Sequence, residues 1–195
     1  MIVIGVTGSF GTGKSLVASI LWSLGAKVLD ADKIARKSLK KGSASYRKIV
    51  KVFGSGVLGA KRNIDRRKLA KRVFSDRKAL KKLNGMIHPE VIRKMKEYIR
   101  KARKGEAVVI DAPLLIEANL TGMVDKLIVV KASRKNQYCR SQKKLGIGKA
   151  ECERRIKNQM PLAKKLKLAD YVIRNDGTKS QTRRQVMQIW RQLWR

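Results

Sequence analysis

The eight residues GSFGTGKS, at positions 8–15, have the types and spacing of a phosphate-binding loop, G-x-x-x-x-G-K-[ST]. Glycines allow the backbone to curve around a polyphosphate with its N–H groups pointing inward, and the N-terminus of a following helix adds a positive dipole. Lys14 would then reach the β- and γ-phosphates, and the Ser15 hydroxyl would bind Mg²⁺. The competing interpretation is a glycine-rich turn that binds no nucleotide.

Three carboxylates end apolar runs further along the chain. Asp30 and Asp32 belong to VLDADKIAR, and residues two apart on an extended backbone point the same way, which is toward the carboxyl end of this strand. Ligands of open α/β sheets bind at that edge, where one carboxylate could accept a proton from a substrate hydroxyl. Asp111, which ends AVVID, suits a role in holding Mg²⁺ through water. The alternatives are a helix cap for Asp32 and a structural turn for Asp111.

Basic residues at helical spacing predict a second group of phosphate contacts. The predicted same-face pairs are Arg155 with Gln159, Arg154 with Lys157, and Arg140 with Lys144. Basic helices that cover a phosphate site neutralise the transferring group and exclude water, whereas solvated helix faces are the competing interpretation. His88 is the only histidine and precedes Pro89 at a predicted helix start, a position where a structural role is commoner than a catalytic one.

Five runs rich in β-branched residues must position these groups: residues 2–6, 27–30, 107–111, 126–131 and 170–174. Helical patterns separate them, so we predict an α/β fold with a parallel sheet covered by helices on both faces. The first helix spans residues 14–24. The expected organisation is a single P-loop kinase-like domain over residues 1–195, with a core of 1–32, 105–133 and 169–195.

Two helical segments interrupt the predicted sheet. Residues 33–104 contain helices near 43–53, 65–74, 76–84 and 89–104 and form the expected acceptor-binding insertion. Residues 134–168 form the expected lid. At the C-terminus, apolar residues at helical spacing indicate packing rather than a site.

The charge is extreme, with 48 Lys and Arg against 14 Asp and Glu in 195 residues. Such a field attracts polyanions. However, the basic residues are spread over many helical segments and aromatic residues make up only 5% of the chain, which favours weak, non-specific nucleic-acid binding at most.

Cys139 and Cys152 have no metal-ligand spacing and are expected to be reduced. The chain has no apolar stretch of membrane-spanning length, so we expect a cytoplasmic protein without membrane contact.

Seven blocks, in this order, resemble the dephospho-CoA kinase family: GVTGSFGTGKS, VLDADKIAR, IDRRKLAKRVF, LNGMIHP, DAPLLIE, RRIKNQMP and ADYVIRNDG. The resemblance extends from Ile2 to about Gly177. It implies transfer of the ATP γ-phosphate to the ribose 3′-hydroxyl of dephospho-CoA, with Mg²⁺, as the last step of coenzyme A synthesis. It also implies a five-stranded parallel sheet with a helical acceptor domain and a lid.

The resemblance also implies roles for individual residues. The ATP-binding residues would be Gly8, Gly11, Thr12, Gly13, Lys14, Ser15 and Leu16, with Asn175 and Gly177 near the adenine. Asp32 would be the base, and Arg140 and Arg155 would contact phosphate from the lid. Arg67, His88, Leu114 and Asp32 would face the acceptor.

The chain departs from the family's usual residues at four places. Ser9, Phe10 and Leu16 stand where glycine, isoleucine and threonine are usual, and Lys144-Leu145 replaces an Arg-Asp pair. Two other functions stay open at this point. One is a different small P-loop kinase acting on a nucleoside or nucleotide, and the other is a basic nucleic-acid-binding ATPase.

Overall fold

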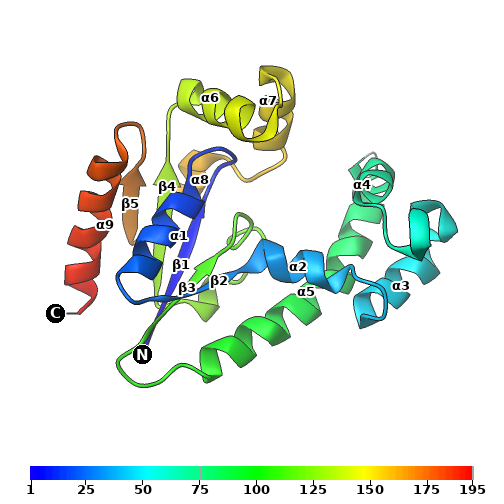
Figure 1. Cartoon of the computed structure of the whole chain (residues 1–195), viewed down its shortest axis with the longest axis horizontal. Helices are drawn as coiled ribbons and strands as arrows, with labels where there is room; N and C mark the ends of the chain where they lie inside the picture. Colours follow the sequence, from blue (N-terminus) through cyan, green and yellow to red (C-terminus); the bar gives the residue numbers. More distant parts are fainter. Residues whose placement is uncertain (75, 195) are drawn as a thin grey trace. The chain divides into compact units, whose positions relative to one another are not determined.

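Five parallel strands form the centre of one compact unit, residues 1–30 and 101–195, which we call the sheet unit (Figure 1). The structure is a computed structural model and describes residues 1–74 and 76–194. The strands are β1 (Ile2–Gly8), β2 (Lys27–Asp30), β3 (Ala107–Asp111), β4 (Lys126–Lys131) and β5 (Tyr171–Arg174). They lie in the order β2-β3-β1-β4-β5. The predicted five-stranded parallel sheet is therefore confirmed, with β1 at its centre.

Two helices, α1 (Lys14–Ser23) and α9 (Lys179–Leu193), pack together and share one apolar core with the sheet. Both helices contribute fully buried side chains to it, among them Val17, Leu21 and Val186, which meet Ile4 and Ile128 of the strands. The predicted C-terminal apolar stripe is thus packing. α9 also begins with a capping box, in which Thr178 and Gln181 satisfy each other's backbone N–H groups.

The remaining elements of the sheet unit follow β3 and β4. A 3₁₀ turn, η3 (Thr121–Met123), precedes β4. After β4 come α6 (Arg134–Leu145), α7 (Lys149–Lys157) and the short α8 (Leu162–Leu166). Figure 1 shows α6 and α7 on the same side of the sheet as the turn between β1 and α1.

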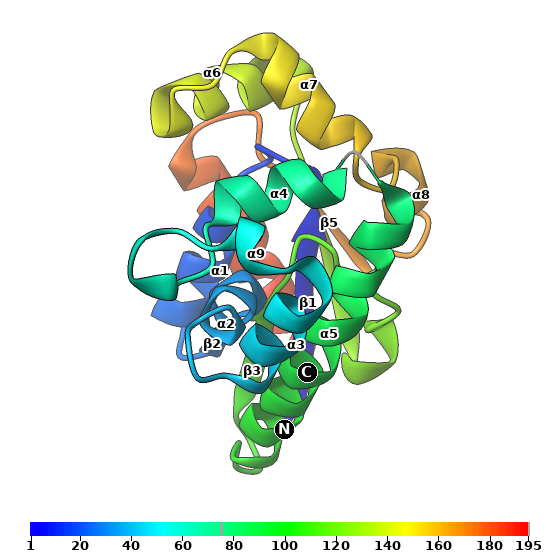
Figure 2. The ribbon, with the colours of Figure 1, turned by 90° about the vertical axis from the view of Figure 1, so that its right-hand side faces the viewer.

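Residues 31–100 form a second compact unit made of helices, the helical unit. It contains α2 (Ala31–Ser38), α3 (Ala44–Phe53), α4 (Arg66–Phe74) and α5 (Arg77–Arg100), with 3₁₀ turns at Ser55–Val57 and Ala60–Arg62. The helices α2, α3 and α4 all contact α5, which Figure 2 shows from the side of this unit. Asp65 begins α4 by accepting bonds from two backbone N–H groups, which lower the pKa of its carboxyl group.

One prediction for this unit is wrong, because α5 is a single helix that contains Pro89. Proline lacks an N–H group and disfavours a helical conformation at the residue before it, so the sequence predicted two helices separated near His88. Tertiary packing overrides this preference, since α5 buries Leu83, Val91 and Met95. In the turn before Pro89, the Ser45 hydroxyl donates a hydrogen bond to the carbonyl group of Met86.

Candidate active site

The GSFGTGKS loop connects the central strand β1 to α1, at the carboxyl edge of the sheet. Its backbone curls around the Lys14 ammonium group, which donates hydrogen bonds to the carbonyl oxygens of Gly8 and Ser9, each at 3.2 Å. Thr12 is fully buried and its hydroxyl closes the turn on Ser9 at 2.9 Å. Ser15 is exposed in the first turn of α1. The loop is therefore shaped by its own bonds and presents a hydroxyl and a cation at a helix N-terminus.

Asn175, which follows β5, locks this loop from the other end of the chain. Its buried amide donates to the Thr12 carbonyl oxygen at 2.9 Å, and its own oxygen accepts from the Thr182 hydroxyl at 2.9 Å. A Cβ on Gly13 would lie 2.2 Å from the Asn175 amide nitrogen, and Gly13 has φ 88°, so only glycine fits there. Asn175 thus sets the shape of the loop, in addition to any contact with a base.

Arg140 joins the same network from α6. Its guanidinium donates to the Thr12 carbonyl oxygen at 3.2 Å and to the Asn175 carbonyl oxygen at 2.7 Å. The backbone of α6 also lies against the loop, because a Cβ on Gly11 would meet the Gln137 carbonyl oxygen at 3.0 Å. The predicted partner Lys144 shares the helix with Arg140. The structure therefore places Arg140 at the phosphate-binding loop.

Arg155 and Gln159 both reach Phe10 of the loop. The Arg155 guanidinium carbon lies 5.2 Å from the centre of the Phe10 ring, and the Gln159 side-chain oxygen accepts from the Phe10 N–H at 2.8 Å. The prediction that they share one helix face is wrong, because α7 ends at Lys157 and Gln159 follows it. The backbone leaves the helix after Asn158, and the side chains converge through this turn instead.

The Glu151 carboxylate binds two arginines of α7. It accepts from Arg155 Nε at 2.9 Å and from Arg154 at 2.6 Å. The hydrogen bond from Arg155 is the largest cause of a lowered pKa at Glu151. Glu151 lies one helical turn before Arg155, so this contact helps to orient the guanidinium that meets Phe10.

Two carboxylates lie side by side at the carboxyl edge of the sheet. Asp30 and Asp111 are register partners of the neighbouring strands β2 and β3, and Asp111 is also paired in register with Val6 of β1. Hydroxyl and carboxylate oxygens are the ligands that Mg²⁺ prefers, so Ser15 and these acids have the right donor chemistry for that ion. Among the described residues, no three Asp, Glu, His or Cys side chains cluster as a metal site of their own.

Asp32 does not continue the strand, and this part of the sequence reasoning is wrong. β2 ends at Asp30 and α2 begins at Ala31, so the extended backbone that would align Asp30 with Asp32 stops between them. Asp32 is an exposed residue in the first turn of α2, where the positive end of the helix dipole stabilises a carboxylate. It belongs to the helical unit.

A buried ion pair lies in the segments after Asp111 and in α8, and no sequence pattern predicts it. Lys165 of α8 is fully buried and donates to Glu117 at 2.7 Å and to the Pro113 carbonyl oxygen at 2.8 Å. Glu117 also accepts from the Met160 N–H at 3.0 Å. Lys165 lies in a lysine-rich run that resembles a solvated face, and its spacing gives no other signal. Leu114, an expected acceptor contact, is 45% exposed in the same segment.

Residues 175–177 also cap α6. The Asp176 carboxylate accepts from the Ser133 N–H at 2.6 Å, which is the main cause of its lowered pKa, and from the Asn136 amide at 3.0 Å. Gly177 follows in the exposed turn before α9. The loop expected near the adenine is thereby bonded both to the phosphate-binding loop and to the start of α6.

The other two expected acceptor contacts lie in the helical unit. Arg67 is exposed in the first turn of α4, and its backbone N–H donates a hydrogen bond to the Asp65 carboxylate at 2.8 Å. His88 is half-buried in the middle of α5, and burial lowers its pKa.

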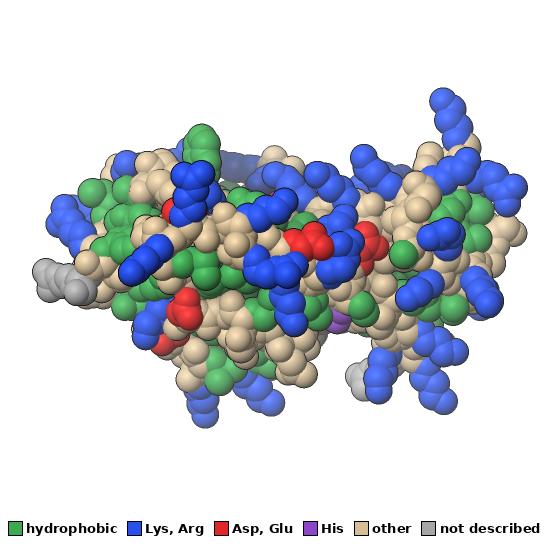
Figure 3. All heavy atoms as spheres, turned by 90° about the horizontal axis from the view of Figure 1, so that it is seen from below, with side chains coloured by type: hydrophobic (Ala, Val, Ile, Leu, Met, Phe, Trp, Pro, Cys, Tyr) green, Lys and Arg blue, Asp and Glu red, His purple; other side chains and the backbone are tan. Residues whose placement is uncertain are grey.

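The basic residues are distributed over both units. The helical unit has 23 Lys and Arg against 5 Asp and Glu, and the sheet unit has 25 against 9. Figure 3 shows basic side chains across the whole visible face rather than in one stripe.

Within the described part of the chain, no helix has the length and apolarity needed to cross a membrane. Cys139 and Cys152 form no disulfide.

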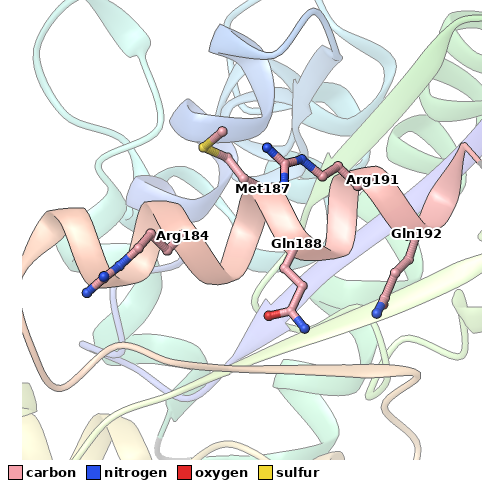
Figure 4. A pocket seen from close by; sticks show the side chains of 5 residues that line it. All are labelled: Arg184, Met187, Gln188, Arg191 and Gln192. Carbon is pink, nitrogen blue, oxygen red and sulfur yellow. The ribbon is translucent and has the colours of Figure 1, made fainter.

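A hollow on the outer face of α9 is separate from the candidate site. Figure 4 shows that its lining side chains spread from one helix; they are Arg184, Met187, Gln188, Arg191 and Gln192. None of them belongs to the phosphate-binding loop or contacts it through a bond described above.

Comparison with known proteins identifies the family of this chain. The family model described as dephospho-CoA kinase matches residues 2–181. A dephospho-CoA kinase from Geobacillus kaustophilus is 43% identical over 195 residues, covering 98% of this chain and 96% of the relative. Another from Carboxydothermus hydrogenoformans is 41% identical over 189 residues, covering 96% and 92%.

Solved structures give the same result. A crystal structure from Thermus thermophilus has a TM-score of 0.88 and 32% identity, covering 98% of this chain and 97% of that one. Dephospho-CoA kinase from Campylobacter jejuni has a TM-score of 0.63 and 27% identity, covering 98% and 96%. Shikimate kinase from Bacteroides thetaiotaomicron, with 15% identity and a TM-score of 0.56, shares the fold. With the family model spanning nearly the whole chain, the protein belongs to the dephospho-CoA kinase family.

Proposed function

We propose that this protein transfers the γ-phosphoryl group of ATP to the ribose 3′-hydroxyl of dephospho-CoA. The supporting observation is a family match over residues 2–181 together with a formed phosphate-binding loop at the carboxyl edge of the sheet. In the reaction, the bond between the γ-phosphorus and the β–γ bridging oxygen breaks as the 3′-oxygen bonds to that phosphorus. The hydroxyl proton passes to a base, and ADP leaves.

The loop would bind the phosphates through Gly8, Gly11, Thr12, Gly13, Lys14, Ser15 and Leu16. Its backbone N–H groups and the N-terminus of α1 stabilise negative charge, and Lys14 would exchange its bonds to the Gly8 and Ser9 carbonyl oxygens for phosphate oxygens. Because charge shifts onto the leaving and transferred groups in the transition state, a cation that is already placed in the loop lowers the barrier.

Mg²⁺ would be held by Ser15 and, through water, by Asp111. When bound, the ion neutralises phosphate charge. Asp30, the register partner of Asp111, would accept hydrogen bonds from water bound to the ion. The chain's own contribution is to hold these oxygens on rigid elements, because Asp111 ends β3 and Asp30 ends β2, the edge strand that pairs with β3.

Acceptor binding is assigned to the helical unit and the segment after β3. Asp32 would take the proton of the 3′-hydroxyl, and Arg67, His88 and Leu114 would contact the acceptor. Asp32 is an exposed carboxylate in the first turn of α2, and a carboxylate is a suitable general base for a hydroxyl proton.

Residues of the lid and of the last sheet loop would complete the site. Arg140 and Arg155 would stabilise the transferring phosphoryl group, and Asn175 and Gly177 would border the adenine. Arg140 already bonds the loop at Thr12, so a small change of its side chain would bring its donors to a phosphate.

The test is phosphoryl transfer from ATP to dephospho-CoA, followed by formation of CoA and ADP, with adenosine and AMP as alternative acceptors. We expect CoA to form and the two other acceptors to react far more slowly. A Lys14→Ala variant should fold, retain little transfer, and serve as the control for contaminating kinases. Preferential phosphorylation of adenosine or AMP, or normal turnover by Lys14→Ala, would contradict the proposal.

A further inference from the structure

Phe10 is the point at which the segment after α7 and the α7 lid helix meet the phosphate-binding loop. Its backbone N–H is bound by Gln159 at 2.8 Å, and its ring lies 5.2 Å from the guanidinium carbon of Arg155. These contacts use different parts of one residue. The backbone bond does not depend on the side chain at position 10, whereas the ring contact does.

We propose that the Phe10 ring is a positioning element that holds the Arg155 guanidinium at the phosphate-binding loop before the lid acts. The inference rests on the proposed function, because it concerns the role of Arg155 in that reaction. Phe10 itself touches no reacting atom, so its effect passes through Arg155.

The ring supplies what the ion pair alone lacks. Arg155 has a side chain that is 43% exposed, and its partner Glu151 also binds Arg154, so this exposed pair orients the guanidinium only weakly. A cation within about 6 Å of an aromatic centre is attracted by the negative face of the ring. Glu151 and Phe10 therefore both contact the guanidinium group of Arg155.

The ring contact is also compatible with phosphate binding. An arginine has five N–H donors, of which Nε serves Glu151. The aromatic face carries no formal charge and offers no carboxylate acceptor that a phosphate would have to displace. Because Phe10 is part of the loop, a guanidinium held by its ring is already close to the phosphates that the loop would bind.

The test is a double-mutant cycle between positions 10 and 155. Phe10→Leu removes the ring and keeps an apolar side chain and the bond to Gln159, whereas Phe10→Tyr keeps the ring. We expect Phe10→Leu to lower kcat about threefold to fivefold with KM for ATP changed less than about twofold, the range that corresponds to an exposed cation–π contact. Phe10→Tyr should restore most of the turnover. In an Arg155→Ala background, Phe10→Leu should cause no further loss.

A matched control uses the other cation–aromatic contact of the lid, in which the Lys149 ammonium lies 5.5 Å from the Tyr138 ring. Tyr138→Leu should change kcat less than about twofold. Equal losses in Phe10→Leu and Phe10→Tyr, or an undiminished effect of Phe10→Leu in the Arg155→Ala background, would overturn the proposal.

A second readout does not depend on catalysis. The ring should shift the NMR resonance of the Arg155 Nε–H group, assigned by its loss in Arg155→Lys, and Phe10→Leu should remove that shift while Phe10→Tyr keeps it. If wild-type protein fails to phosphorylate dephospho-CoA but shows the shift, the proposed function fails and the positioning contact stands. If the resonance is unaffected by Phe10→Leu, the contact itself is refuted.

Discussion

The buried ion pair of Lys165 gives a sharp prediction about stability. Lys165 is the largest side chain that the described part of the chain buries completely, and its ammonium bonds Glu117 at 2.7 Å. The other Glu117 oxygen is buried and has no hydrogen-bond partner among the described residues. Lys165→Met therefore removes the nearest positive charge from a carboxylate that already lacks one hydrogen bond. Such a change leaves a buried charge uncompensated.

The magnitude follows from these contacts. Removal of one partner of a buried pair costs about 3–5 kcal/mol, and we take the lower end, about 3 kcal/mol, because the Glu117 side chain keeps 22% exposure. The Pro113 carbonyl group loses one donor but retains the Thr7 hydroxyl at 3.1 Å, so it adds little. For a chain of this size, about 3 kcal/mol corresponds to a fall in Tm of roughly 6–12 °C.

The assay is the free energy of unfolding from urea denaturation, with thermal unfolding as a second measure. Lys165→Met should be destabilised, whereas Lys164→Met, an exposed neighbour, should stay within about 0.5 kcal/mol of wild type. Lys165→Met combined with Glu117→Met should recover most of the loss, because an apolar pair removes the unpaired charge. If the double variant is as unstable as the single one, or the single one as stable as wild type, the ion-pair reasoning is refuted.

Three further outcomes test other parts of the molecule. Asp32→Asn should lower kcat roughly 10²-fold with little change in ATP affinity measured by calorimetry, and Asp30→Asn should cost less; normal turnover by Asp32→Asn would place the base elsewhere. Burial lowers the pKa of His88, so the folded state binds fewer protons there than the unfolded state and should lose stability as pH falls below about 6.5. His88→Gln should flatten that part of the curve of unfolding free energy against pH, and an unchanged slope would contradict this assignment. Nucleic acid should bind weakly and be released by salt, whereas sequence-selective binding in about 0.5 M salt would point to a dedicated surface.

The sheet and the phosphate-binding loop could be predicted because their signals are local. Apolar runs bounded by turn residues identified the five strands, and fixed residue types at fixed spacing identified the loop. The direction of the Asp32 side chain could not be predicted, because β2 ends at Asp30 and α2 begins at the next residue. The predicted helix boundary before Pro89 is wrong because the packing of a long helix outweighs a local preference.

The contacts of the candidate site were mostly beyond sequence reasoning. Arg140, Arg155 and Asn175 were expected near ATP. Their contacts were not, because Arg140 and Asn175 bond to Thr12, and Arg155 lies against the Phe10 ring, across large distances in the sequence. Lys165 shows the limit most clearly. Its charge predicts exposure, and only the fold brings Glu117 within reach.

The central position of β1 has a consequence for how the chain acquires its activity. β1 pairs with β3 and β4, which begin at residues 107 and 126, so the first strand to be synthesised has no partner strand until more than half of the chain has followed. The loop after β1 acquires its last contact later still, because the Thr12 carbonyl group accepts a hydrogen bond from Asn175, 163 residues further along the chain. A nascent chain that ends before residue 175 carries the whole phosphate-binding motif without the bond that Asn175 makes to Thr12. We therefore expect full nucleotide affinity to develop only after Asn175 has been synthesised, and such long-range closure makes folding slow relative to helix formation.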